Sequence, residues 1–172
     1  GSYQLNPAQW TPGEPVFAAL AADYARLRDG QPLVIGGHAW RCIAGWGHAP
    51  EHMALHCEAL GILISGDMVL PRISTNVSVY EMEPEADALT LFLDSIDRFM
   101  PLPEDTLVLP SHGKPFQGLH TRIQQLHDHH RERLVEVMQA ARERPVSAYD
   151  VLPVLFRRPL DLHQTTFALG ES

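Results

Sequence analysis

Three short apolar runs, each followed within a few residues by a side chain able to bind a metal, constrain this sequence more than any other feature. His48 follows the first run in a loop marked by glycine and proline, and Asp67 follows the run Ile62–Ser65. His112 follows the run Thr106–Leu109. Imidazole and carboxylate are the groups with which proteins bind zinc and similar metals. The pattern therefore predicts buried strands that deliver polar residues to one candidate metal site.

The composition is that of a globular protein of one domain, or one domain with an appendage. The chain has 172 residues, of which 45% are hydrophobic and 20% charged. No apolar stretch approaches the ~18 residues that a membrane span needs, and no signal peptide opens the chain, so we expect no membrane partner. The net charge of −8 argues against a general nucleic-acid surface. Cys42 and Cys57 form no disulfide framework, which favours a reducing, cytoplasmic location.

Apolar periodicity predicts helices separated by short strands. The helices are expected over Val16–Arg28, Glu85–Met100 and Leu119–Glu143, with a shorter one capped by Ser147 and ending near Phe156. The strands are expected over Leu33–Ile35, His38–Ala44, the run after His52, Ile62–Ser65 and Thr106–Leu109. Residues Met68–Tyr80 show no helical period and are expected to form a loop over the candidate site.

The motifs around the three polar residues resemble those of the metallo-β-lactamase-fold hydrolases. That family typically shows Pro-Gly-His-Thr-x-Gly-His, then Ser/Thr-Gly-Asp, then Gly-His-Gly, in this order. Here the counterparts are residues 45–52, residues 64–67 and residues 109–113. The resemblance covers about Leu33 to Pro115, and the remaining residues are similar to a tail found in the branch with glyoxalase II and lactamase-like endoribonucleases.

The resemblance implies an α/β fold, namely half of an αββα sandwich: a mixed sheet with helices on one face. Residues 1–116 would form the C-terminal half of the metallo-β-lactamase-like domain, and residues 117–172 a truncated, helical, winged-helix-like tail. The family's His-x-His-x-Asp-His motif is absent. Residues 127–130 read His-Asp-His-His, but Arg131 and Glu132 stand where Asp-His is required. The resemblance therefore implies a fragment.

The same resemblance assigns roles to individual residues in a centre with two divalent metal ions. His48 would bind the first metal, His112 the second, and Asp67 would bridge both and take part in catalysis. His52 would support the site without binding a metal, and Gly66 and Gly113 would allow close approach. Zinc is the expected metal, with iron or manganese as alternatives. A catalytic zinc needs about three protein ligands, so the fragment alone is expected to bind metal weakly or not at all and to be close to inactive.

Hydrolysis of a thioester or other ester, through a metal-activated water, is the implied reaction of the full-length protein. Phosphodiester cleavage of RNA is the alternative enzyme, and a metal-free interaction module is the alternative outside catalysis. The expected partner is thus a small-molecule ester. A half fold would also leave one apolar sheet face uncovered, so we expect the fragment to form a homodimer through that face.

The remaining candidate residues have simpler interpretations. His38 and His56 lie on expected strands and are interpreted as sheet histidines, and Cys57 as a small buried apolar residue. Trp46 is interpreted as a packing residue. The histidines of the last helices are expected to be solvated: His120, His127, His129, His130 and His163.

Overall fold

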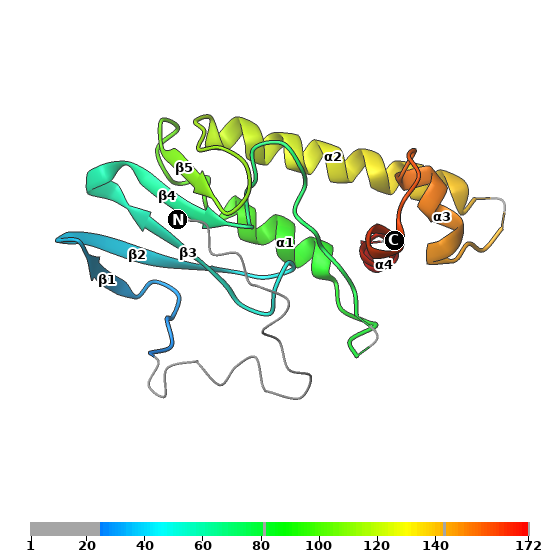
Figure 1. The fold of residues 1–172 in the computed structure, drawn as a ribbon, viewed down its shortest axis with the longest axis horizontal. Coiled ribbons are helices and arrows are strands. Elements are labelled where there is room, and N and C mark those ends of the chain that lie inside the picture. Colours follow the sequence, from blue (N-terminus) through cyan, green and yellow to red (C-terminus); the bar gives the residue numbers. More distant parts are fainter. Residues whose placement is uncertain (1–24, 81, 143, 172) are drawn as a thin grey trace, which may run out of the picture.

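A five-stranded sheet with two helices over one face forms the centre of the molecule, and a helical tail continues from it (Figure 1). The computed structural model describes residues 25–80, 82–142 and 144–171. The strands are β1 (Pro32–Ile35), β2 (His38–Gly45), β3 (His52–Cys57), β4 (Ile62–Gly66) and β5 (Leu107–Pro110). The helices are η2 (Glu58–Leu60), α1 (Ala88–Asp97), α2 (Leu119–Ala140), α3 (Ala148–Leu155) and α4 (Leu162–Glu171).

The strands follow one another across the sheet in chain order. Strands β1 to β4 are antiparallel, whereas β5 runs parallel to β4. Gly36 and Gly37 join β1 to β2 with φ of 60° and 80°, the left-handed conformation that two-residue hairpin loops need. The parallel pair needs a crossover, and α1 lies within it. The expected strands are confirmed, except that His52 begins β3 and does not lie in the preceding loop.

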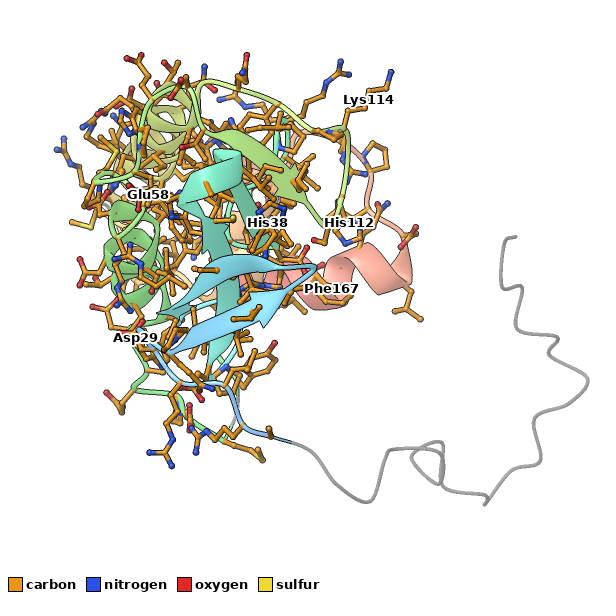
Figure 2. All side chains as sticks on the ribbon, turned by 90° about the vertical axis from the view of Figure 1, so that its left-hand side faces the viewer. Asp29, His38, Glu58, His112, Lys114 and Phe167 are labelled. Atoms are coloured by element: carbon orange, nitrogen blue, oxygen red, sulfur yellow. The ribbon has the colours of Figure 1, made fainter. Side chains whose placement is uncertain are left out.

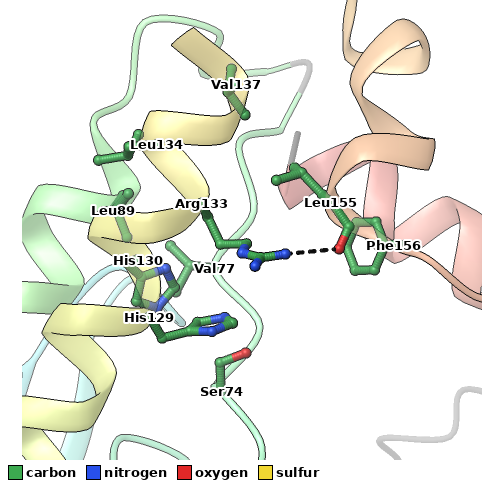
Figure 3. A pocket seen from close by; sticks show the side chains of 10 residues that line it. All are labelled: Ser74, Val77, Leu89, His129, His130, Arg133, Leu134, Val137, Leu155 and Phe156. Carbon is green, nitrogen blue, oxygen red and sulfur yellow. Dashed lines mark hydrogen bonds between the residues drawn. The ribbon is translucent and has the colours of Figure 1, made fainter. Parts of the chain in front are cut away.

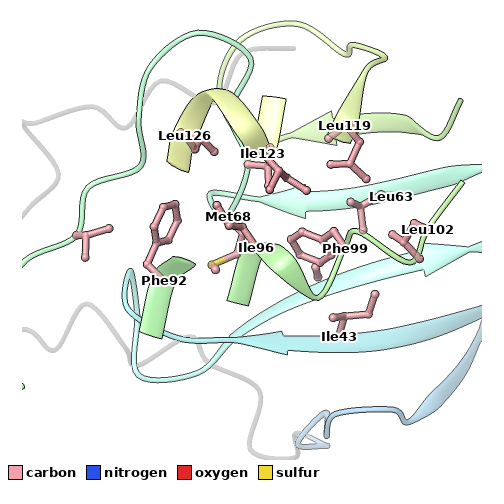
Figure 4. Close-up of a cluster of buried hydrophobic side chains, with 14 of the residues drawn as sticks. Ile43, Leu63, Met68, Phe92, Ile96, Phe99, Leu102, Leu119, Ile123 and Leu126 are labelled. Carbon is pink, nitrogen blue, oxygen red and sulfur yellow. The ribbon is translucent and has the colours of Figure 1, made fainter. Parts of the chain in front are cut away.

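The hydrophobic core lies between one face of the sheet and helices α1 and α2 (Figure 4). Its sheet residues are Ile43, Ala54, Leu63 and Val108, and its helix residues include Phe92, Ile96, Leu119, Ile123 and Leu126. These helix residues recur at intervals of three and four, which places them on one face of each helix. The expected helices at α1 and α2 are confirmed with shorter ends. Because the first turns of α2 belong to this core, the boundary at residues 116/117 stays a prediction.

The other face of the sheet is apolar as well. The register places Cys42 opposite Leu55 and Ile64 opposite both Leu55 and Leu109, all on the face away from the helices. Ile64 is 38% exposed. A sheet that is apolar on both faces belongs in the middle of a layered fold, since each face needs a packing partner. This agrees with the expected half of an αββα sandwich.

The tail of the described chain is helical. Ser147 caps α3 through a reciprocal capping box with Asp150, as expected from the sequence. Helix α4 belongs to the expected helical tail, and it contacts the loop Met68–Tyr80, where the Val79 N–H donates to the Gly170 carbonyl (2.9 Å). The winged-helix likeness stays a prediction. Residues 16–24 of the predicted helix Val16–Arg28 lie outside the described residues. Residues 25–28 are described and are not helical.

None of the helices among the described residues is long and apolar enough to cross a membrane.

Candidate metal centre

The structure brings the three predicted ligands together around the Asp67 carboxylate. Asp67 Oδ2 lies 3.6 Å from His48 Nε2, and Asp67 Oδ1 lies 3.5 Å from His112 Nε2. Each carboxylate oxygen thus faces a different imidazole. His112 follows β5 on a loop at the rim of the molecule (Figure 2), and its side chain is exposed, whereas those of His48 and Asp67 are half-buried.

Strand pairing explains why Asp67 and His112 are neighbours. Strands β4 and β5 are parallel, and Gly66 pairs with Pro110, so the residues after both strands leave the sheet at the same edge. The Ser111 N–H donates to the Gly66 carbonyl (3.1 Å), which extends this pairing. The Ser111 hydroxyl then donates to Asp67 Oδ1. One side of the carboxylate is therefore fixed by the loop that carries His112.

His48 is oriented from the opposite side. Its Nδ1 lies 2.8 Å from the carbonyl oxygen of Asn76. A carbonyl only accepts, so Nδ1 carries a proton, and Nε2 is the ring nitrogen that faces Asp67. This arrangement is typical of histidines that bind metals, since the second nitrogen is held by a backbone carbonyl or carboxylate. The tautomer needed for ligation is therefore the one that the surroundings of His48 favour.

His52 contacts the turn that carries Asp67. The Asp67 N–H donates to His52 Nε2 (3.3 Å), so this nitrogen is occupied by the backbone. Burial lowers the pKa of His52, and nearby His48 lowers it further, against a smaller opposing effect of Asp67. His52 is thus neutral at pH 7 and accepts a hydrogen bond, the geometry of a supporting residue.

Gly66 and Gly113 are required by contacts with protein side chains. Gly66 has a φ of 56°, and a Cβ there would overlap the imidazole of His52. Gly113 has a φ of 86°, and a Cβ would lie 2.6 Å from Cγ of Pro71. Among the described residues, the His52 side chain therefore approaches Gly66 closely, and the Pro71 side chain approaches Gly113.

The loop Met68–Tyr80 holds both halves of the site, a role that the sequence did not reveal. The Thr75 hydroxyl donates to the carbonyl of Asp67, and Asn76 fixes His48. Arg122 of α2 holds the loop itself, donating to the carbonyls of Leu70 (2.7 Å) and Ile73 (2.9 Å).

Two of the residues that support the site differ in how visible they are in the sequence. Ser111 lies inside one of the recognised motifs, so its position could have indicated a role. Arg122 carries no such local signal, because its two acceptors lie 52 and 49 residues earlier in the chain.

The other singled-out residues lie elsewhere. His38 is exposed on β2, while His56 on β3 and Cys57 are buried, as expected. The Trp46 ring packs under the Arg98 guanidinium, 5.7 Å from its centroid, which agrees with a packing role.

The expectation of solvated histidines on α2 is wrong for two of them. His120 Nε2 lies 2.9 Å from the Leu102 carbonyl, which holds the start of the helix to the α1–β5 connection. His130 is half-buried beside Phe92, with ring centroids 5.8 Å apart. His127 pairs with Asp97 on α1 (2.7 Å). His163 has no described side chain.

The spacing of the donor atoms is compatible with metal binding on either side of Asp67, with two donor atoms on each side. For zinc–ligand bonds of about 2.0–2.2 Å, tetrahedral geometry places two donor atoms roughly 3.4 Å apart. The observed nitrogen–oxygen separations of 3.6 and 3.5 Å are close to that value. Across the described chain, however, no three His, Cys, Asp or Glu side chains are grouped closely enough to hold one ion. Each position has one imidazole and one carboxylate oxygen.

Comparison with known proteins agrees with this fold. The family described as "Metallo-beta-lactamase-like, C-terminal domain" matches residues 134–172. The probable metallo-hydrolase YqjP of Bacillus subtilis (strain 168) is 29% identical over 134 residues, which are 76% of this chain and 41% of that protein. These matches are consistent with a chain that carries part of a metallo-β-lactamase fold.

Two solved structures show the same relationship. A β-lactamase domain protein from Burkholderia ambifaria is 59% identical with a TM-score of 0.86, over 89% of this chain and 45% of that one. A metallo-β-lactamase family protein from Thermus thermophilus is 30% identical with a TM-score of 0.70, over 84% of this chain and 45% of that one. The chain thus spans about half the length of the relatives it matches, and the family implies divalent metal binding.

Proposed function

We propose that this chain carries one half of a two-metal centre in a hydrolase that cleaves a thioester or another ester. The observation that supports it most is the Asp67 carboxylate, which presents one oxygen to His48 and the other to His112. In this proposal His48 binds the first ion, His112 binds the second, and Asp67 bridges them. His52 supports the Asp67 turn and binds no metal.

Two divalent ions bound there would supply an activated water and polarise the carbonyl oxygen of the ester. Zinc is the proposed metal, and iron or manganese would accept the same ligands. The protein's own part is orientation. The Asn76 carbonyl keeps the proton on Nδ1 of His48, and the Ser111 hydroxyl fixes one carboxylate oxygen of Asp67. The ester class rests on the resemblance of the motifs to those of the glyoxalase II branch.

The chain by itself is proposed to bind metal weakly and to be inactive. Each ion would have two protein donors, against about three in a catalytic zinc site. The apolar sheet face that includes Leu55, Ile64 and Leu109 is proposed to pair with a second copy of the chain. Sedimentation at micromolar concentration tests the pairing: a dimer is expected, and a monomer would contradict it.

A zinc titration tests the metal centre directly. We expect the 172-residue chain to bind zinc weakly, and His48→Ala or Asp67→Asn to weaken binding further. His38→Ala is the matched control, because His38 is exposed on the same strand that leads to the site. Equal effects of His38→Ala and His48→Ala would show that zinc binds to surface histidines, and would contradict the proposed ligand set.

The full-length protein tests the reaction. We expect near-stoichiometric loading with two metals and hydrolysis of a simple thioester, lost in His48→Ala and His112→Ala. Turnover of single-stranded RNA without thioester hydrolysis would make the phosphodiester the substrate. Absence of metal from the full-length protein would refute the hydrolase proposal.

A further inference from the structure

A second site lies away from the candidate metal centre, in a cavity of about 340 Å³. Three segments surround it: the second half of α2, the loop residues Ser74 and Val77, and the end of α3 (Figure 3). Leu89 of α1 closes one side. The volume is at the lower end of the range of small-molecule sites. The cavity is therefore large enough for a small organic ligand.

The lining has an apolar part and a polar part. The apolar part consists of Val77, Leu89, Leu134, Val137, Leu155 and Phe156. The polar part consists of His129, His130, Arg133 and Ser74, and the lining contains no carboxylate. A ligand that matches this cavity has an apolar body and one end that accepts hydrogen bonds.

Arg133 provides the charge. Its Nη1 donates weakly to the Leu155 carbonyl (3.4 Å; Figure 3) and pairs with Glu136 (3.0 Å). Glu136 also pairs with Arg157 (2.9 Å), so two guanidinium groups share one carboxylate and the group keeps a net positive charge. Arg133 Nε is buried and has no hydrogen-bond partner among the described residues. Buried donors usually have a hydrogen-bond partner. Because no described residue fills that place, Nε is available to donate to a ligand.

The two imidazoles add uncharged donors. His130 Nε2 is also buried without a hydrogen-bond partner among the described residues. Burial lowers the pKa of His130 to about 4, with His129 and His127 adding to the effect. The pKa of His129 is lowered by burial and by Arg133. Both rings are neutral at pH 7, so each has one N–H to donate while Arg133 remains the cation of the lining.

We propose that this cavity binds a small monocarboxylate with an alkyl or aryl group. The carboxylate accepts from Arg133 Nε and His130, and its apolar group packs on Leu134, Val137 and Phe156. A cationic ligand would meet Arg133, and a neutral one would leave the positive charge unmatched. None of these residues belongs to the candidate metal centre, so the proposal does not depend on ester hydrolysis.

Calorimetric titration of the 172-residue chain with sodium octanoate tests the proposal. Octylammonium and 1-octanol have the same apolar body with a positive or a neutral end, and are expected to bind at least about tenfold more weakly, the effect of a charge-assisted hydrogen bond. Arg133→Gln is expected to weaken octanoate binding by a similar factor. Arg131→Gln is the matched control, because Arg131 is exposed on the same helix and pairs with Asp128.

A second variant keeps the test decisive if Arg133→Gln does not fold. Val137→Phe places a larger apolar side chain in the cavity and is expected to abolish octanoate binding while the circular dichroism spectrum is retained. The proposal is overturned if octanoate does not bind to the wild type, if octanol or octylammonium binds as tightly, or if Arg131→Gln weakens binding as much as Arg133→Gln.

Discussion

Replacing Arg122 with methionine tests whether α2 holds the loop that orients the candidate site. The Arg122 side chain donates to the Leu70 carbonyl through Nε (2.7 Å) and to the Ile73 carbonyl through Nη2 (2.9 Å). Methionine keeps an unbranched apolar stem on the helix but removes every donor. The variant therefore isolates the hydrogen bonds from the packing of the stem.

The expected loss follows from the surroundings of the two carbonyls. A hydrogen bond from a charged donor contributes about 1.5–3 kcal/mol. Leu70 is 3% exposed, so its carbonyl loses its partner without access to water, whereas Ile73 is 62% exposed and its carbonyl can be hydrated. Burial lowers the pKa of Arg122, which means that its charge is partly desolvated and that removing it recovers some free energy. We expect a net loss of about 2 kcal/mol in the free energy of unfolding.

Urea unfolding followed by circular dichroism measures this loss. Arg72→Met is the matched control, because Arg72 is exposed in the same loop. Its effect is expected to stay within about 0.5 kcal/mol. In Arg122→Met we also expect the NMR signal of the His48 Nδ1 proton to broaden, since the Asn76 carbonyl loses its fixed position. A change in stability below about 0.5 kcal/mol for Arg122→Met would refute the holding role.

Two further predictions concern the turn at Asp67 and the cavity on α2. Gly66→Ala is expected to lower the melting temperature, because φ is 56° and the new Cβ would displace the His52 ring. Adding His52→Ala to this variant should recover part of the lost melting temperature. If nothing is recovered, backbone strain at residue 66 alone explains the loss. For His130, the folded pKa of about 4 lies below the ordinary value of 6.5, so protonation favours unfolding. Its contribution is complete above about pH 6.5 and falls by about 1–2 kcal/mol toward pH 4, allowing for solvent screening. His130→Gln should flatten this part of the stability–pH curve, and an unchanged curve would contradict the assigned burial.

Local patterns in the sequence predicted much of the fold. The strands and α1 were predicted because apolar side chains alternate or recur at the period of their element, and Ser147 because a cap is a local device. The grouping of Asp67 with His112 follows from the parallel pairing of β4 and β5. The order of the motifs therefore predicted that Asp67 and His112 lie close together, which their separation in the sequence does not show.

Residues that act through distant contacts could not be predicted in the same way. Arg122 contacts carbonyls about fifty residues earlier in the chain, and the helical pattern of α2 shows it only as a polar position. His130 was interpreted as solvated because polar residues surround it in sequence, yet the fold places it beside Phe92. Such roles depend on which segments meet, and that is set by the packing of the whole sheet and its helices.

The partly exposed Ile64 on the second apolar face of the sheet and the incomplete metal positions of the described chain point to one missing partner. Asp67 and His112 leave the sheet at the carboxyl ends of β4 and β5, so a second sheet packed on the Ile64 face would end beside them. A self-dimer through that face would cover its apolar side chains without adding ligands of the absent motif. We therefore expect dimerisation of this chain to leave its zinc affinity unchanged. Compared with this chain, the full-length protein should both bind zinc more tightly and dimerise less. Zinc titrations above and below the dissociation constant of the dimer test this difference. Zinc affinity that rises with dimer formation would mean that the partner copy supplies metal ligands. A second copy of this chain, and not the rest of the full-length protein, would then both cover the apolar face and complete the metal positions.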